Sequence, residues 1–370
     1  MNTPGEGWKP LPEAPAHPPL RLRRLGIDAQ QEALVFMRAD CHVCRAEGFT
    51  ARSRINVQLD ERWLIATLHV VHSDLLAPGE ASLSEHAWKR LHAQEGDQIH
   101  VSHPTPPASF DAVRGKLEGA TLTEPALDML VADIAAGAYD DLHLASVVSA
   151  LASGPPQAPE TVSLVRALVR TGERLRWKAR VVADVHCMGR TGYGALPLLV
   201  VPLLAANGIV VPMSVLPVGG APAVAADVMG VLAPVDLDAT AAQHAVEREG
   251  ACVTWAGSLR LSPVSDQLGR VSHALGLEGD AQAVAAVFAH KIAAGVTHLL
   301  VEVPVAPGSR LGDCVLGERL VRHLTRVASP LGLCVDVLLR EAPAPLGRGL
   351  GPGREAFDVL AVLQNAPDAP

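Results

Sequence analysis

The sequence predicts a multidomain α/β protein with a β-rich N-terminal domain, a helical domain and a mainly parallel α/β domain. The chain has 370 residues, which corresponds to about two or three domains. Hydrophobic residues make up 49% of it and charged residues 19%, a composition typical of a globular chain with an aliphatic core. Beyond Trp177, apolar strand-like runs alternate with helical patterns, which indicates a parallel sheet covered on both faces.

The N-terminal part changes character near residue 20. Residues 1–20 are rich in proline and carry almost no apolar pattern, so we expect a flexible tail there. From 21 to 103, short segments rich in Val, Ile and Leu alternate with polar or glycine-containing turns, which predicts the β-rich domain. The expected strands are Ala33–Met37, Arg54–Leu59, Trp63–Val71 and Gln98–Ser102. The proline-rich segment His103–Pro107 then predicts a stiff linker.

The rest of the chain predicts a helical domain followed by the α/β domain. Residues 108–176, to which 262–295 contribute, form the helical domain, and residues 177–261 with 296–370 form the α/β domain. The expected helices of the helical domain are Glu124–Ala136, His143–Ala152 and Glu160–Thr171.

Beyond Trp177 the pattern alternates between strand and helix. The expected strands are Ala179–Ala183, Ile209–Val211, His298–Val305 and Leu333–Leu339, and the expected helices are Ala195–Ala206 and Ala281–Ala294.

Charge and cysteine content exclude several classes of protein. The net charge of -8 comes from 31 basic and 39 acidic residues spread along the chain, so no basic stripe is available for nucleic acid. Six cysteines are too few for a secreted disulfide framework and, with no apolar signal core at the N-terminus, indicate a cytoplasmic protein. The uncharged segment Ala195–Ala226 is interrupted by prolines, so we interpret it as buried α/β core and expect no membrane span.

The segment Val181–Gly194 holds the most informative motif, in which a strand runs into a glycine-containing loop that opens a helix. This pattern places His186 at the carboxyl end of a strand, where open α/β sheets bind ligands. The helix N-terminus that follows favours an anion. The alternative is that His186 only hydrogen-bonds the loop.

Several longer motifs identify a family. From about Leu25 onward the chain resembles the pyrimidine-nucleoside phosphorylases, most closely the branch of thymidine phosphorylases with an added N-terminal domain, which is related to the archaeal AMP phosphorylases. The motifs that carry the resemblance are Cys41–Phe49, Asp74–Glu80, Gly172–Leu175, Leu232–Val235, Gly347–Pro352 and Asp358–Leu363.

The resemblance implies phosphorolysis of thymidine, or of a related nucleoside or nucleotide, to free base and pentose 1-phosphate. Inorganic phosphate is then the co-substrate, and no metal or organic cofactor is required. The resemblance also implies a cleft between the helical and α/β domains and a homodimer formed through the helical domain. The family continues into a C-terminal domain beyond residue 370, which we expect this chain to lack.

On the side of the departing base, the family uses a histidine, an arginine, and a serine and lysine on one helix. His186 and Arg270 match the first two, and Lys291 matches the second of two lysines. Ala286 replaces the serine, and His290 replaces the first lysine. Residues 286 and 290 are one helical turn apart, so His290 would still bring a proton or a charge to the substrate. The alternative is a histidine whose hydrogen bonds are satisfied beside the core.

On the phosphate side, Val185 replaces the phosphate-binding lysine of the family, and most of the hydroxyl groups are also replaced. Arg190, with backbone N–H groups of the loop around Gly189, is the candidate replacement. The alternative is a solvated loop arginine. The losses therefore also suggest a second function: a degenerate family member that binds a nucleoside or a partner protein without catalysis.

Two smaller features remain open. Cys41 and Cys44 have the spacing of a zinc or redox motif, but no second pair of ligands follows at suitable spacing, so we expect a turn between strands. Asp184 and Asp227 would either orient a ligand or cap a helix.

Overall fold

The computed structural model describes residues 17–29, 32–104, 107–188, 196–216, 224–277, 279–305, 311–312, 314–341 and 347–370. The fold divides into two compact units, the first comprising residues up to 110 with 133–140 and the second 111–132 with 141–370. Helices and largely parallel strands make up the second unit, so the mixed α/β class predicted from the sequence is confirmed.

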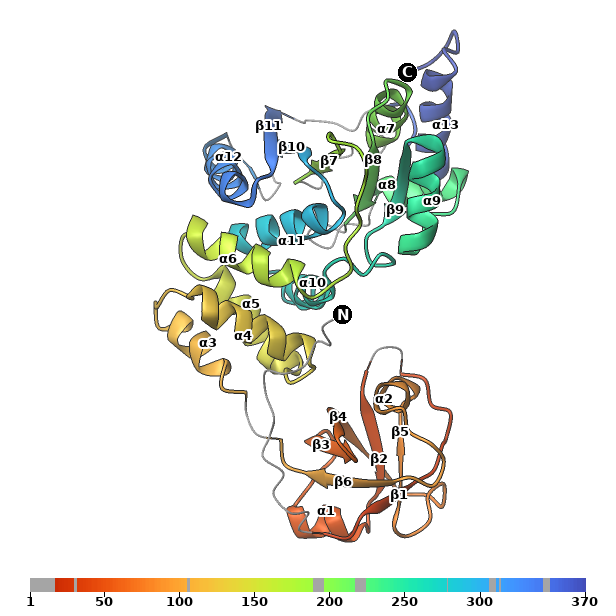
Figure 1. Cartoon of the computed structure of the whole chain (residues 1–370), viewed down its shortest axis with the longest axis vertical. Helices are drawn as coiled ribbons and strands as arrows, with labels where there is room; N and C mark the ends of the chain where they lie inside the picture. The colour runs from red at the N-terminus through yellow and green to blue at the C-terminus, as the bar shows by residue number, and fades with distance from the viewer. Residues whose placement is uncertain are drawn as a thin grey trace. The chain divides into compact units, whose positions relative to one another are not determined.

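The first unit contains a closed barrel (Figure 1) with strand order β1-β5-β2-β4-β3-β6. Alternation explains its core: in β3 the side chains of Ile55, Val57 and Leu59 are buried and their neighbours are partly exposed. Closure of the barrel leaves no unpaired edge strand. The strands are β1 (Leu20–Leu22), β2 (Leu34–Arg38), β3 (Arg54–Leu59), β4 (Arg62–Val71), β5 (Glu80–Leu83) and β6 (Gln98–Ser102).

Two helices cover the barrel, α1 (His42–Glu47) and α2 (Glu85–Leu91). The Cys41–Cys44 motif lies at the start of α1, so it forms a short helix between β2 and β3 rather than the expected turn. The Cys44 thiol donates a hydrogen bond to Cys41 and lowers the pKa of Cys41 to about 6. Within the described residues, no group of three or more His, Cys, Asp or Glu side chains is arranged to hold a metal ion.

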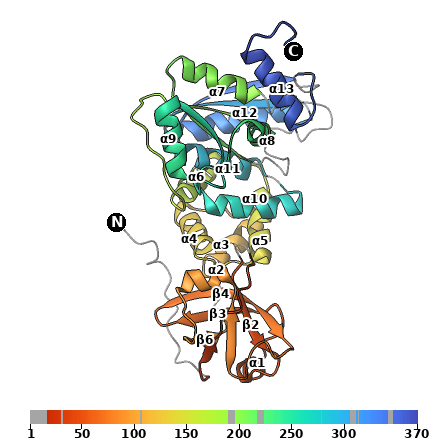
Figure 2. The same ribbon diagram turned by 90° about the vertical axis from the view of Figure 1, so that its right-hand side faces the viewer.

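Helices form one side of the second unit (Figure 2). Among them, α6 packs along α11, and Lys116 binds the buried carboxylate of Glu160 at 2.8 Å. The helices are α3 (Phe110–Leu117), α4 (Glu124–Ala135), α5 (Asp141–Ala152), α6 (Ala158–Val169), α10 (Pro263–Leu275) and α11 (Asp280–Ala293).

A parallel sheet forms the rest of the second unit. Strands β11-β10-β7 and β8-β9 pair in parallel, and a parallel bridge between Val182 and Val210 joins the two groups. The strands are β7 (Ala183–Cys187), β8 (Val211–Val215), β9 (Ala251–Trp255), β10 (His298–Val305) and β11 (Cys334–Glu341). The chain runs from β7 outward to β9 and then returns to β10 on the other side of β7. The strand order therefore reverses at β7, which makes the carboxyl end of β7 the expected ligand site.

Helices lie on both faces of this sheet. On one face, α7 and α8 pack against Met213 and Val253, and α13 packs on α8. On the other face, α11 lies under β7 and β10, and α12 packs on β10 and β11 (Figure 1). The remaining helices are α7 (Leu196–Ala206), α8 (Val224–Leu232), α9 (Ala239–Glu249), α12 (Cys314–Ala328), the 3₁₀ helix Ser329–Leu331 and α13 (Pro352–Leu363).

The bounds of several elements differ from the sequence prediction; the strand expected at Ile209–Val211, for example, is β8 at Val211–Val215. The strand expected at Ala179–Ala183 begins only at Ala183 and runs to Cys187. Helix α7 forms within the segment expected to be buried core, but Leu203 is 57% exposed because the helix is apolar on all sides and only one side contacts the sheet. Across the described residues, every helix is too short or too polar to cross a bilayer.

Gly172 lies just after α6, and the backbone of a neighbouring segment leaves no room for a side chain there. A Cβ atom at this position would lie 2.1 Å from the carbonyl oxygen of Leu261. We expect Gly172→Ala to lower the free energy of unfolding by about 1–3 kcal/mol, because the backbone must move to relieve the overlap.

The matched control is Gly269→Ala. Gly269 is exposed within α10 and has open space around it, so this change should raise the free energy of unfolding by about 1 kcal/mol. Urea denaturation measures both. Equal effects of the two substitutions would contradict the close approach at Gly172.

Candidate active site

His186 lies near the carboxyl end of β7 and is only 6% exposed. Side chains alternate along a strand, so His186 and Asp184 share one face of the sheet and Val185 points to the other. The face with His186 is the one that α11 covers, because Lys291 of α11 reaches Asp184. The structure therefore places the predicted histidine and lysine on the same side of β7.

Lys291 is fully buried and binds two strands at once. Its Nζ donates to Asp184 Oδ2 at 2.7 Å and to the carbonyl oxygen of Ser214 on β8 at 2.6 Å. Burial raises the pKa of the Asp184 carboxyl, and the Lys291 ammonium opposes that shift. Asp184 thus anchors Lys291 rather than capping a helix, and the ammonium of Lys291 holds the sheet and α11 together.

The imidazole of His186 is neutral at pH 7. Complete burial, and after it the positive charges of Lys291 and His290, lower the pKa of His186 to about 3. Its Nε2 atom has no hydrogen-bond partner within the described part of the chain, and neither does the buried hydroxyl of Ser214. The bridge between Val182 and Val210, continued along both strands, places His186 level with Ser214 on the same face. Among the described residues, each of these two neighbouring strands thus carries one buried polar atom without a hydrogen-bond partner.

His290 is almost fully buried on α11, one residue before Lys291. Its Nδ1 is 2.8 Å from the carbonyl oxygen of Ala286, and its Nε2 is 3.1 Å from Asp266 Oδ1 on α10. Both ring nitrogens therefore have partners from within the protein. The charge of His290 nevertheless acts on His186.

Arg270 is placed differently from His186, His290 and Lys291. Its guanidinium is 63% exposed and binds Asp141 Oδ1 of α5 at 2.8 Å. It lies one turn beyond Asp266 on α10, so the two side chains leave the same side of that helix. The structure places no direct contact between Arg270 and His186, and its role at the base stays a prediction.

The predicted phosphate side is only partly visible. Gly189 and Arg190 lie outside the described residues. Val185, which occupies the position of the lysine in the resemblance, is buried at 7% exposure on the face opposite His186. Asp227 lies exposed in the first turn of α8, where an acidic residue suits a helix N-terminus.

Sequence reasoning missed Ser214 and Asp266 as neighbours of the site. Ser214 lies within an apolar strand, and only the fold brings its carbonyl oxygen to Lys291. Asp266 is spaced 24 residues from His290, and no short motif links them. The thiol of Cys252 on β9 is also close enough for Asp184 to act on it. Burial, followed by this carboxylate, raises the pKa of Cys252 to about 12, so the thiol is not a nucleophile at neutral pH.

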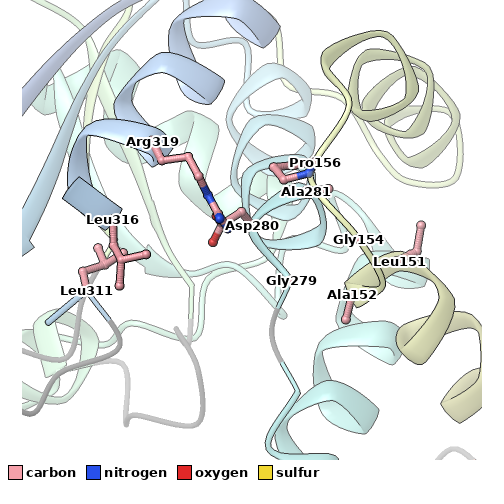
Figure 3. A pocket seen from close by; sticks show the side chains of 10 residues that line it. All are labelled: Leu151, Ala152, Gly154, Pro156, Gly279, Asp280, Ala281, Leu311, Leu316 and Arg319. Carbon is pink, nitrogen blue, oxygen red and sulfur yellow. The ribbon is translucent and has the colours of Figure 1, made fainter. Parts of the chain in front are cut away.

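A cavity of about 270 Å³ lies at the other end of α11 (Figure 3). It is lined by Ala281 of that helix and by Gly279 just before it, by Leu311 and Leu316, and by the Asp280–Arg319 ion pair. Ten residues of helix, about 15 Å, separate Asp280 from His290. The cavity is therefore separate from the cluster around His186, and its lining contains none of the predicted site residues.

The low pKa of His186 predicts a specific loss of stability in acid. The unfolded chain takes up a proton near pH 6.5, whereas the folded chain does so only near pH 3, so stability falls as the pH drops through that window. Between pH 7 and pH 5 the titration of His186 should lower the free energy of unfolding by about 2 kcal/mol.

The measurement is urea denaturation of the wild type and of His186→Gln at several pH values. The variant lacks this titration, so its free energy of unfolding should fall less between pH 7 and pH 5. Parallel pH profiles for the two proteins would show that His186 titrates normally in the fold.

The chain is similar to three curated proteins that share the name "Putative thymidine phosphorylase". It is 46% identical to the protein from Polaromonas sp. over 351 residues, which cover 95% of this chain and 69% of that protein. It is 41% identical to the protein from Legionella pneumophila, with 95% and 68% covered, and 43% identical to that from Maricaulis maris, with 94% and 67% covered. The chain belongs to the thymidine phosphorylase family. The resemblance drawn from the sequence motifs is thereby confirmed.

A solved structure extends the likeness of this thymidine phosphorylase family member to its fold. The chain superposes on anthranilate phosphoribosyltransferase (TrpD) from Thermus thermophilus with a TM-score of 0.58 and 17% identity, covering 70% of this chain and 84% of the other. At this identity the likeness concerns the fold alone. No protein-family model matches the chain.

Proposed function

We propose that the protein transfers the pentosyl group of thymidine, or of a related nucleoside or nucleotide, to inorganic phosphate. The observation that carries this proposal is that two buried atoms, His186 Nε2 and Ser214 Oγ, have no hydrogen-bond partner within the described residues, on the strands next to the point where the strand order reverses. Burying such atoms without hydrogen bonds is costly. A bound base with carbonyl and N–H groups would satisfy both.

In the proposed reaction, a phosphate oxygen forms a bond to the anomeric carbon of the pentose. The bond from that carbon to the base nitrogen breaks, and its electron pair stays on the base. His186, in the tautomer with the proton on Nε2, donates a hydrogen bond to the base oxygen on which negative charge develops. A neutral donor suits this task because it is preorganised in a dry site and binds the anion more strongly than the ground state.

The phosphate site lacks the lysine that the family resemblance implies. Val185 supplies no cation, so the charge would come from Arg190 together with backbone N–H groups around Gly189. No metal or organic cofactor enters this reaction. On the same family grounds we propose that the protein is cytoplasmic and forms a homodimer. Light scattering of the purified protein would test the dimer.

The second candidate function is binding of a nucleoside or base without turnover. The specific observation in its favour is Val185, an apolar side chain buried where the family resemblance puts a phosphate-binding lysine. Each lost charge-assisted hydrogen bond costs about 1.5–3 kcal/mol, so the loss of several would reduce phosphorolysis by orders of magnitude.

One assay separates the two functions. The purified protein is incubated with thymidine, uridine or AMP, with and without inorganic phosphate, and free base and pentose 1-phosphate are quantified. Phosphate-dependent release of both products supports the enzyme. A rise in melting temperature with thymine, without product in any reaction, supports the binding protein.

A further inference from the structure

His290 has an unusual hydrogen-bond environment, because both of its ring nitrogens face groups that accept. Nδ1 is 2.8 Å from the carbonyl oxygen of Ala286, which has no proton to give. Nε2 is 3.1 Å from a carboxylate oxygen of Asp266. A neutral imidazole carries a proton on only one nitrogen and needs a donor at the other.

The count of protons follows directly. Nδ1 at 2.8 Å from the Ala286 carbonyl is favourable with a proton on Nδ1, and Nε2 at 3.1 Å from Asp266 Oδ1 is favourable with a second proton between those two atoms. The pair therefore holds one proton more than a neutral histidine beside an ionised aspartate. Asp266 is 38% exposed, so water stabilises its negative charge. Burial of His290 at 1% exposure opposes a charge on the imidazole, and the direct contact with the Asp266 carboxylate offsets that cost.

The neighbouring charges fit this arrangement. Lys291 is already balanced by Asp184 at 2.7 Å, and His186 is neutral. Several ionisable side chains on helices around α11 have partners of their own. These pairs are Glu160 with Lys116, Asp141 with Arg270, Asp280 with Arg319 and His323 with Thr161. Asp266 is thus the carboxylate that balances His290.

We propose that His290 is a fixed imidazolium held by Asp266, which places a positive charge near His186 on the side of the site that binds the base. Asp266 acts as a positioning residue, because it sets the charge and ring orientation of His290 without touching the substrate. This inference rests on the proposed function for its consequence. The imidazolium would stabilise the negative charge that develops on the departing base.

The protonation state can be measured without turnover. NMR spectra of protein labelled with ¹⁵N-histidine report both ring nitrogens, and the signals of His290 are assigned by their loss in His290→Gln. We expect two protonated nitrogens of similar shift at neutral pH. In Asp266→Asn, the amide can donate to Nε2, so His290 should lose that proton and the two nitrogens should become inequivalent.

Asp141→Asn is the matched control, since it removes a carboxylate from a different ion pair of the same unit and should leave the His290 signals unchanged. One protonated and one bare nitrogen in the wild type at neutral pH would overturn the proposal. So would an unchanged His290 spectrum in Asp266→Asn.

A second measurement tests the consequence and uses thymine as the probe. Asp266→Asn should weaken thymine binding by about tenfold, and His290→Lys, which supplies a fixed cation, should restore it in the Asp266→Asn background. Failure of the wild type to bind thymine would count against the proposed function and leave the NMR result standing. Wild-type binding that Asp266→Asn leaves unchanged would overturn the role of the imidazolium.

Discussion

Lys291→Met should be strongly destabilising and lower the free energy of unfolding by about 3–5 kcal/mol. The substitution leaves the carboxyl of Asp184 buried without its ammonium partner, and an uncompensated buried charge is far more costly than a missing surface pair. The carbonyl of Ser214 loses a donor as well. Urea denaturation monitored by circular dichroism provides the measurement.

Two comparisons identify the cause of this loss. Adding Asp184→Asn to Lys291→Met should recover much of the stability, since the charge itself is then removed. Arg270→Met breaks an ion pair whose partners are both 63% exposed, so it should cost no more than about 1 kcal/mol. If Lys291→Met and Arg270→Met were equally mild, the ion pair between α11 and β7 would not contribute as described.

The free energy of unfolding of Lys291→Met should also depend on pH in a defined direction. Without the ammonium, the carboxyl of Asp184 is protonated in the folded protein, whereas in the unfolded chain the same carboxyl is ionised above about pH 4. Folding therefore takes up a proton. The deficit relative to wild type should therefore shrink as the pH falls from 7 to 5.

His186→Ala should reduce phosphate-dependent release of base by about 10²–10³-fold. The substitution removes the donor aimed at the developing negative charge, and loss of one such donor has an effect of this size. The proposed contact forms mainly as the base departs, so kcat should fall more than KM rises. The assay measures product formation over a range of thymidine concentrations.

His244→Ala is a suitable control, because His244 is exposed on α9, away from β7, and should leave activity unchanged. Circular dichroism checks that both variants are folded. Wild-type turnover that survives in His186→Ala would remove His186 from the proposed reaction.

Periodicity predicted much of the fold. The strands Arg54–Leu59, Gln98–Ser102 and His298–Val305 have the predicted bounds, because strict alternation or continuous apolar runs marked them. The start of β7 was misplaced since Val181 and Val182 are as apolar as the strand itself. Val182 pairs with Val210 in a single bridge and accepts hydrogen bonds from Thr297 and His298, and no local pattern reveals these contacts.

The site was predictable to the extent that its residues lie in motifs. His186 and Lys291 were both predicted on the side of the departing base. The structure brings them to one face of β7, and their contact with a base stays a prediction. Ser214 and Asp266 could not be found this way, because their roles depend on strand pairing and on the packing of α10 against α11. The expected position of Arg270 beside the base also depends on geometry that helical spacing does not specify.

The anchoring of Lys291 also limits how the molecule moves. Since one ammonium is bonded to both β7 and β8, α11 and the centre of the sheet form a single rigid element. A substrate would then enter by movement of the elements around this one, for example of α10, whose Asp266 and Arg270 make partly exposed contacts. Loosening those contacts would change the rate of substrate entry while leaving the position of His186 intact.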